Sequence, residues 1–179
     1  MFDSVVRRDP IAAHARSSVA QREVGTDASC TCGETRPRAL QRHTSGFTCA
    51  LCTRCAEGKA PHDKHHISGK ANSHVIILVP VNDHRAQISV NQYNWPKRTL
   101  ENADGSPLLS GAACIRGFVD IVDYLTEIEV VSCFIEQFLL WIAVMLETLD
   151  EFLVSLKGRQ WWVETKLQTF APEVSNGKK

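Results

Sequence analysis

A cysteine-rich stretch near the N-terminus is too polar to bury a hydrophobic core of its own. Residues 29–60 hold five of the seven cysteines in the 179-residue chain and few large apolar side chains. Such a segment needs disulfides or a metal to hold it together. The chain opens without an apolar run long enough for a secretory signal, which predicts a reducing, cytoplasmic setting. Metal ligation is therefore the expected stabiliser.

The spacing of the cysteines suits zinc. Cys30-Thr-Cys32-Gly is followed, after sixteen residues, by Cys49-Ala-Leu-Cys52-Thr-Arg-Cys55. Zinc takes four thiolate or imidazole ligands at tetrahedral corners, and two close pairs on separate turns supply them. We predict that Cys30, Cys32, Cys52 and Cys55 bind a structural Zn²⁺, with Cys49 as the alternative ligand.

Charge is unevenly distributed along the chain, although its sum is zero. Residues 1–60 carry 9 basic and 6 acidic side chains, residues 61–118 carry 6 and 4, and residues 119–179 carry 5 and 10. The first two thirds can therefore meet a polyanion, and the last third cannot. We divide the chain into a polar, flexible tail over 1–28, with a short helix around 10–22 as the alternative, a domain over 29–118, and a helical region over 119–179.

The centre of the chain changes character. The run HVIILVPV, rich in β-branched residues, predicts a buried strand. The following NDHRAQISVNQ predicts a helix that opens on Asn82 or Asp83 as its cap. Five histidines fall in this stretch: His62, His65, His66, His74 and His84. Adjacent histidines on an extended segment point to opposite faces, so one can hold a metal while the other faces substrate.

Residues 65–98, HHISGKANSHVIILVPVNDHRAQISVNQYNWPKR, resemble the HNH endonucleases of the ββα-metal superfamily. The upstream Cys-x-Cys-Gly and Cys-x2-Cys resemble the zinc knuckles that many of these enzymes carry. The likeness covers residues 29–118 and is nearest to small nucleases of bacterial and phage genomes. It implies an α+β fold, with a ββα-metal core, an N-terminal zinc knuckle and a C-terminal helical region. It also implies hydrolysis of DNA in the cytoplasm of a bacterial or phage-infected cell.

The resemblance implies a role for each residue of the motif. His65 would bind the catalytic cation, and His66 would be the general base that deprotonates the attacking water. Asn72 would orient that base or support the metal loop, with Asn82 as its rival and as a further cation ligand. His84, on the helix, would bind the cation. The sequence departs from the commonest pattern in its longer spacing from Asn72 to His84.

The chemistry of these residue types agrees with such roles. Imidazole, with an unperturbed pKa of about 6.5, can act as a base at physiological pH. Imidazole and oxygen ligands suit Mg²⁺ or Mn²⁺, with Zn²⁺ or Ni²⁺ as other occupants. Basic side chains near the motif are expected to contact the DNA backbone without reading base edges: Lys64, Lys70, Arg85, Lys97 and Arg98. The alternative function is a non-catalytic, zinc-stabilised module that binds DNA or protein.

A heptad pattern marks the last third of the chain. Apolar residues recur at alternating spacings of three and four: Ile135, Phe138, Ile142, Met145, Leu149, Phe152 and Leu156. This seam predicts a helix over 132–156 that either packs on its own domain or pairs with a second copy of the chain as a homodimer. Glu136 and Gln137 interrupt the apolar run, so no membrane span is expected.

Overall fold

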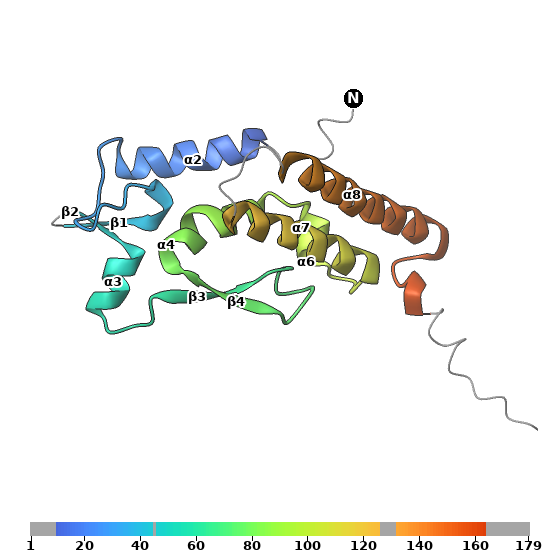
Figure 1. Cartoon of the computed structure of the whole chain (residues 1–179). Coiled ribbons are helices and arrows are strands. Elements are labelled where there is room, and N and C mark those ends of the chain that lie inside the picture. Colours follow the sequence, from blue (N-terminus) through green and yellow to red (C-terminus); the bar gives the residue numbers. More distant parts are fainter. Residues whose placement is uncertain (1–9, 45, 126–131, 164–179) are drawn as a thin grey trace, which may run out of the picture.

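The described part of the chain combines helices with two small antiparallel sheets (Figure 1). The structure is a computed structural model that describes residues 10–44, 46–125 and 132–163. The first nine residues of the predicted tail, and residues 126–131 and 164–179 of the predicted helical region, lie outside the described residues. The predicted α+β class is confirmed at this level.

The N-terminal part surrounds a small core built largely from cysteine. Its elements are α2 (Pro10–Val24), η1 (Pro37–Ala39), the hairpin of β1 (Leu40–His43) and β2 (Gly46–Cys49), and α3 (Ala50–Ala56). α2 is the helix that the sequence offered as the alternative around 10–22, and it packs against η1 and β1. The core consists of Cys30, Leu40 and Cys49, with Val24 and Leu51 packed beside it. Apolar mass is therefore small here, as predicted.

A second hairpin presents one face to the protein and the other to solvent. β3 (His62–His66) pairs antiparallel with β4 (Ile76–Pro80). Asp63 and the buried His65 face the helix that follows, whereas Lys64 alternates to the exposed side. Because side chains alternate along a strand, residues next to each other in the sequence of β3 lie on opposite faces of the hairpin.

A helical segment follows the second hairpin directly. It consists of α4 (Val81–Asp83), a π-helical turn η2 (His84–Ile88) and α5 (Ser89–Tyr93). The predicted helix is confirmed, but both predicted caps are wrong, because Pro80 occupies the N-cap position and no side chain caps the helix. Asn82 and Asp83 lie within the first turn, and their side chains bond to Leu51 and Arg36 instead.

The C-terminal part is a pair of helices. α6 (Lys97–Glu101) is followed by two long helices, α7 (Pro107–Leu125) and α8 (Ser132–Lys157). The second of these is the helix predicted over 132–156. The two helices pack against each other. Small, fully buried residues at Ala112, Ala113 and Ala143 are consistent with close packing of the two helices.

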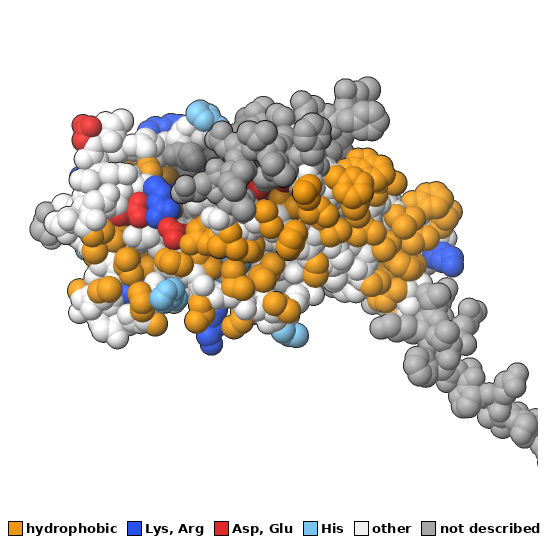
Figure 2. Space-filling view, in the orientation of Figure 1, with side chains coloured by type: hydrophobic (Ala, Val, Ile, Leu, Met, Phe, Trp, Pro, Cys, Tyr) orange, Lys and Arg blue, Asp and Glu red, His pale blue; other side chains and the backbone are white. Residues whose placement is uncertain are grey.

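The heptad seam does not make the contact with α7. Among the described residues of α8, Leu140, Ala143 and Asp150 are the buried ones. Six seam residues are instead 45–63% exposed: Ile135, Phe138, Met145, Leu149, Phe152 and Leu156. Figure 2 shows hydrophobic side chains gathered along α8. Despite this stripe, none of the described helices has the length and apolarity required to span a bilayer.

Buried ionic contacts hold α8 against α6 and α7. Asp150 is fully buried and accepts hydrogen bonds from Arg98 and Ser106. Arg116 donates two hydrogen bonds of 2.8 Å to the carboxylate of Glu147. Charges buried to this degree are tolerated only when paired. These pairs therefore determine which stripe of α8 faces the protein, and the seam is left outside.

Candidate functional site

Four cysteine sulfurs meet in the N-terminal part. The Sγ atoms of Cys30, Cys32, Cys49 and Cys52 all lie within 4.8 Å of one another. Those of Cys32 and Cys49 are 3.5 Å apart. A Zn–S bond of about 2.3 Å corresponds to a tetrahedral edge of about 3.8 Å. The cluster is thus close to the size that a zinc ion needs, and it could hold a metal ion.

The cluster contains Cys49, the alternative ligand of the sequence prediction, in place of Cys55. Cys49 ends β2 and is the N-cap of α3, where its sulfur accepts a hydrogen bond from the N–H of Cys52. The cap position directs this sulfur toward the first turn, on which Cys52 lies. Cys55 follows near the end of α3, is exposed, and lies outside the four-sulfur cluster.

The electrostatics of the cluster favour a bound cation. The backbone N–H groups of Cys32 and Cys49 lower the pKa of the Cys30 thiol to about 6. The sulfur of Cys52 lies against those of Cys32, Cys49 and Cys30, and this crowding raises its pKa. Four thiols at such distances cannot all ionise beside one another, whereas a divalent ion removes the repulsion between them. An all-thiolate donor set suits zinc.

A pair of histidines meets where the second hairpin contacts the helix. The ring centroids of His65 and His84 are 5.2 Å apart in an edge-to-face arrangement. Burial, and then the proximity of His84, lowers the pKa of His65 to about 4. That ring is therefore neutral at pH 7 and retains a lone pair. Two imidazoles brought together from separate elements can serve as ligands of one divalent ion.

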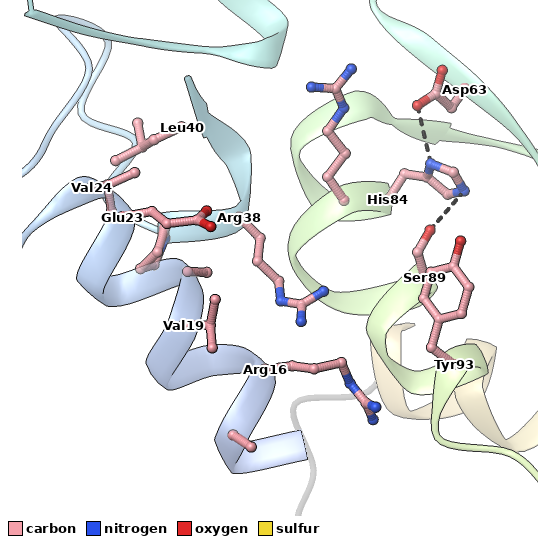
Figure 3. A pocket seen from close by; sticks show the side chains of 14 residues that line it. Arg16, Val19, Glu23, Val24, Arg38, Leu40, Asp63, His84, Ser89 and Tyr93 are labelled. Atoms are coloured by element: carbon pink, nitrogen blue, oxygen red, sulfur yellow. Dashed lines mark hydrogen bonds and ion pairs between the residues drawn. The ribbon is translucent and has the colours of Figure 1, made fainter. Parts of the chain in front are cut away.

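Asp63 completes this group, and the sequence reasoning missed it. Its Oδ2 lies 3.0 Å from Nδ1 of His84 (Figure 3). Its Oδ1 forms an ion pair with Arg54. His84 Nε2 lies 3.1 Å from the hydroxyl of Ser89. A metal-binding histidine commonly donates its second ring N–H to a carboxylate, and Asp63 has that geometry. The sequence did contain a signal for Asp63: it lies two residues before His65, and side chains two residues apart on a strand lie on the same face.

His66 lies at the end of β3. Its Nδ1 is 3.2 Å from the carbonyl oxygen of Ser73. A carbonyl can only accept, so this contact selects the tautomer with the proton on Nδ1 and leaves a lone pair on Nε2. The carbonyl of His66 in turn accepts a hydrogen bond of 2.9 Å from the side chain of Gln92, which ties the strand end to α5.

Asn72 anchors the loop that holds His66. Its Nδ2 donates to the carbonyl of Thr99 at 2.9 Å, and its Oδ1 accepts from Asn102 at 2.9 Å. The next residue, Ser73, supplies the carbonyl that contacts His66. Asn72 therefore acts on the predicted base through the loop and has no hydrogen bond to the imidazole among the described contacts.

Asn82 belongs to a different junction. Its Oδ1 accepts from the N–H of Leu51 at 2.9 Å, and its Nδ2 donates to Glu34 at 3.1 Å. Hydrogen bonds from Arg36 lower the pKa of Glu34 to about 2, so this acceptor stays ionised. Asn82 and His84 are two residues apart in the helical segment, so their side chains point about 200° apart around its axis. Asn82 therefore faces the cysteine region, and the structure does not bring it to His84.

The predicted DNA contacts have different surroundings. Lys64 and Lys70 are exposed, and Arg85 lines a cleft beside His84. The Nζ atom of Lys97 lies 3.6 Å from Oε1 of Glu101. Arg98 forms ion pairs with Asp150 and Glu151. Arg98 is thus engaged in holding α8. The remaining four basic residues are distributed over the hairpin, its loop and two helices.

Comparison with known proteins gives no match. No protein-family model, no characterised protein and no solved structure is similar to this chain.

Proposed function

We propose that the chain is a metal-dependent DNA endonuclease of HNH type that hydrolyses phosphodiester bonds. The observation that carries the proposal is the placement of three histidines on one hairpin and the helix after it. His65 and His84 meet on one side of β3, and His66 is held at its end with Nε2 available. The proposal includes action in the cytoplasm of a bacterial or phage-infected cell, where thiols stay reduced.

The residues would divide the reaction between them. His66 Nε2 takes a proton from a water molecule, the resulting hydroxide attacks phosphorus, and the bond to the leaving oxygen breaks. His65 and His84 would hold the divalent cation, and Asp63 would keep His84 in the tautomer with a lone pair on Nε2, the nitrogen that faces the Ser89 hydroxyl in this structure. The cation, when bound, supplies charge stabilisation for the phosphate and the leaving oxygen.

His66→Ala tests this proposal. Wild-type protein is expected to nick supercoiled plasmid when Mg²⁺ or Mn²⁺ is added, and the variant should be slower by about 10²–10⁴-fold. His74→Ala is the matched control, because His74 is exposed in the adjacent loop. The cation is omitted rather than chelated in the blank, since a chelator also strips cysteine sites. Cleavage by His66→Ala at the wild-type rate would contradict the assignment.

A second candidate is the non-catalytic, zinc-stabilised module that binds DNA or protein. The four-cysteine cluster favours it equally, because a structural metal requires no reaction at the histidines. Folded wild-type protein that binds DNA without added cation, and nicks none with any cation, would support this candidate over the nuclease.

We also propose that the exposed seam of α8 pairs with a second copy of the chain. Heptad spacing is typical of helices that pack on another helix, and the seam remains exposed after α8 has packed on α7. The acidic residues of the described helix lie off the seam: Glu136, Glu147, Asp150 and Glu151. Two identical seams therefore meet without like-charge contacts. An apolar stripe of this extent is unusual on a monomer.

Leu149→Lys tests the pairing, because it puts a charge in the middle of the seam. Wild-type protein should sediment as a dimer at micromolar concentration, and the variant as a monomer. Gln137→Lys adds the same positive charge at an exposed position outside the seam and should remain dimeric. A wild-type monomer under these conditions would rule out the dimer.

A further inference from the structure

A cleft of about 740 Å³ lies between α2 and the helical segment η2–α5 (Figure 3). Asp63, His84 and Ser89 line one side of it. α2 and η1 supply the other side, although they belong to the N-terminal part of the chain. The candidate nuclease residue His84 is thus reached through a cleft whose opposite wall lies outside the motif.

Arginine side chains outnumber carboxylates in the lining of this cleft. Arg16 from α2, Arg38 from η1 and Arg85 from η2 all line it. Within the part of the chain that the structure describes, Nε and one terminal nitrogen of Arg16 and Nε of Arg38 are buried and have no hydrogen-bond partner. The acidic groups in the lining are Glu23 and Asp63, and Asp63 already pairs with Arg54 and His84.

These properties favour a phosphate group as the ligand. A guanidinium nitrogen that is buried without an acceptor costs free energy, which an anionic oxygen recovers. The planar fork of arginine matches phosphate oxygens in pairs. Tyr93, also in the lining, is 64% exposed and offers a ring on which a base can stack. Phosphate and stacking contacts in one cleft suit a nucleotide chain better than an isolated anion.

We propose that this cleft binds the phosphodiester backbone of DNA, with Arg16 and Arg38 as phosphate-binding residues that flank the site at His84. The inference rests on the proposed function, because it takes DNA as the substrate that reaches His84. It adds that α2 forms one wall of the substrate site. The N-terminal helix, and not only the hairpin and the helix after it, then contributes to affinity.

Arg16→Gln and Arg38→Gln test the proposal in the full chain. Binding of a short fluorescein-labelled DNA duplex is measured by anisotropy without divalent cation, over a series of NaCl concentrations. Each variant should raise Kd by about tenfold at low salt, as expected for losing a charged hydrogen bond. Each should also reduce the slope of log Kd against log salt by about one. Thermal unfolding of each variant is measured as well, so that a change in affinity can be separated from a loss of folding; the nitrogens Nε and Nη2 of Arg16 and Nε of Arg38 have no hydrogen-bond partner to lose.

Arg22→Gln is the matched control. It removes the same charge from the same helix, but Arg22 is exposed and lies about 240° around α2 from Arg16. If the wild type binds DNA and nicks plasmid while Arg16→Gln and Arg38→Gln bind as tightly as Arg22→Gln, the cleft proposal is overturned and the nuclease proposal stands. If the wild type neither binds nor nicks DNA, the proposed function fails and the cleft proposal fails with it.

Discussion

Cys49→Ser is expected to abolish tight zinc binding and to unfold the N-terminal part of the protein, whereas Cys55→Ser should change neither. Structural zinc sites in small domains contribute about 10–16 kcal/mol of apparent binding free energy at pH 7, and losing one of four thiolates forfeits a large share of it. The core around the cluster is too small to compensate, since two of its three buried residues are Cys30 and Cys49 themselves. Zinc per chain, by elemental analysis, and thermal unfolding measure the two effects.

The pair of cysteine variants also decides between the two ligand sets. If Cys55→Ser loses zinc and Cys49→Ser keeps it, the metal uses the ligand set first predicted from spacing. Excess chelator should lower the melting temperature of the wild type and of Cys55→Ser equally. Lowering the pH should also lower the melting temperature. Cysteine thiols must lose a proton to bind metal, and protons compete with the metal for the sulfurs as the pH falls. An unchanged melting temperature in chelator would contradict a structural metal.

Gly117→Ala is expected to lower the free energy of unfolding by more than about 3 kcal/mol, at the upper end of the cost of overpacking. A Cβ atom at Gly117 would lie 2.0 Å from the backbone oxygen of Ile67 and 2.7 Å from its carbonyl carbon. Backbone atoms cannot rotate away, so α7 or the strand end must move. Helix propensity alone would predict the opposite sign, since alanine is preferred over glycine by about 1 kcal/mol. Denaturant unfolding monitored by circular dichroism measures the difference.

Gly111→Ala is the matched control in the same helix. Its added Cβ would meet only the end of the Leu146 side chain, at 3.4 Å. This variant should be as stable as the wild type or slightly more stable. Because Ile67 directly follows His66, Gly117→Ala should also slow plasmid nicking at temperatures where it is still folded. Equal stability of the two glycine variants would show that α7 does not approach the strand end this closely.

Local pattern predicted the elements well where one physical signal dominated. The β-branched run became β4 and the heptad pattern became α8. The prediction that this strand is buried was wrong, because among the described strands β4 pairs only with β3 and leaves Ile76 and Leu78 41% and 66% exposed. The cysteine spacing predicted a four-sulfur cluster, although Cys49 takes the place of Cys55 in it. Prediction from local pattern failed where a side chain had two possible hydrogen-bond partners. Asn82 has the chemistry of a helix cap, but Glu34 and Leu51 take its amide, and Pro80 starts the helix instead. No pattern within ten residues contains that information.

The candidate site shows the same division. His65, His66 and His84 could be picked from sequence because their residue type is informative by itself. Asp63 and Arg16 could not be picked in this way, because a carboxylate and an arginine are common surface residues. The roles proposed for them rest on their neighbours in space, which are His84 for Asp63 and the cleft for Arg16. Arg98 was predicted to contact DNA because it is basic and lies beside the motif, but in the structure it forms an ion pair with the buried Asp150.

Local sequence pattern is enough to predict helices and strands from periodicity, a group of cysteines that could hold a metal ion in a part of the chain with little apolar mass, and a set of histidines that can bind metal or protons. Which partners these groups meet depends on how the elements pack against one another. Cys49 enters the cluster because it caps α3, and the heptad seam faces outward because the buried Asp150 and the half-buried Glu147 pair with arginines on α6 and α7. Periodicity is a property of neighbours along the chain, whereas the pairing of charges and of hydrogen-bond donors is a property of neighbours in space.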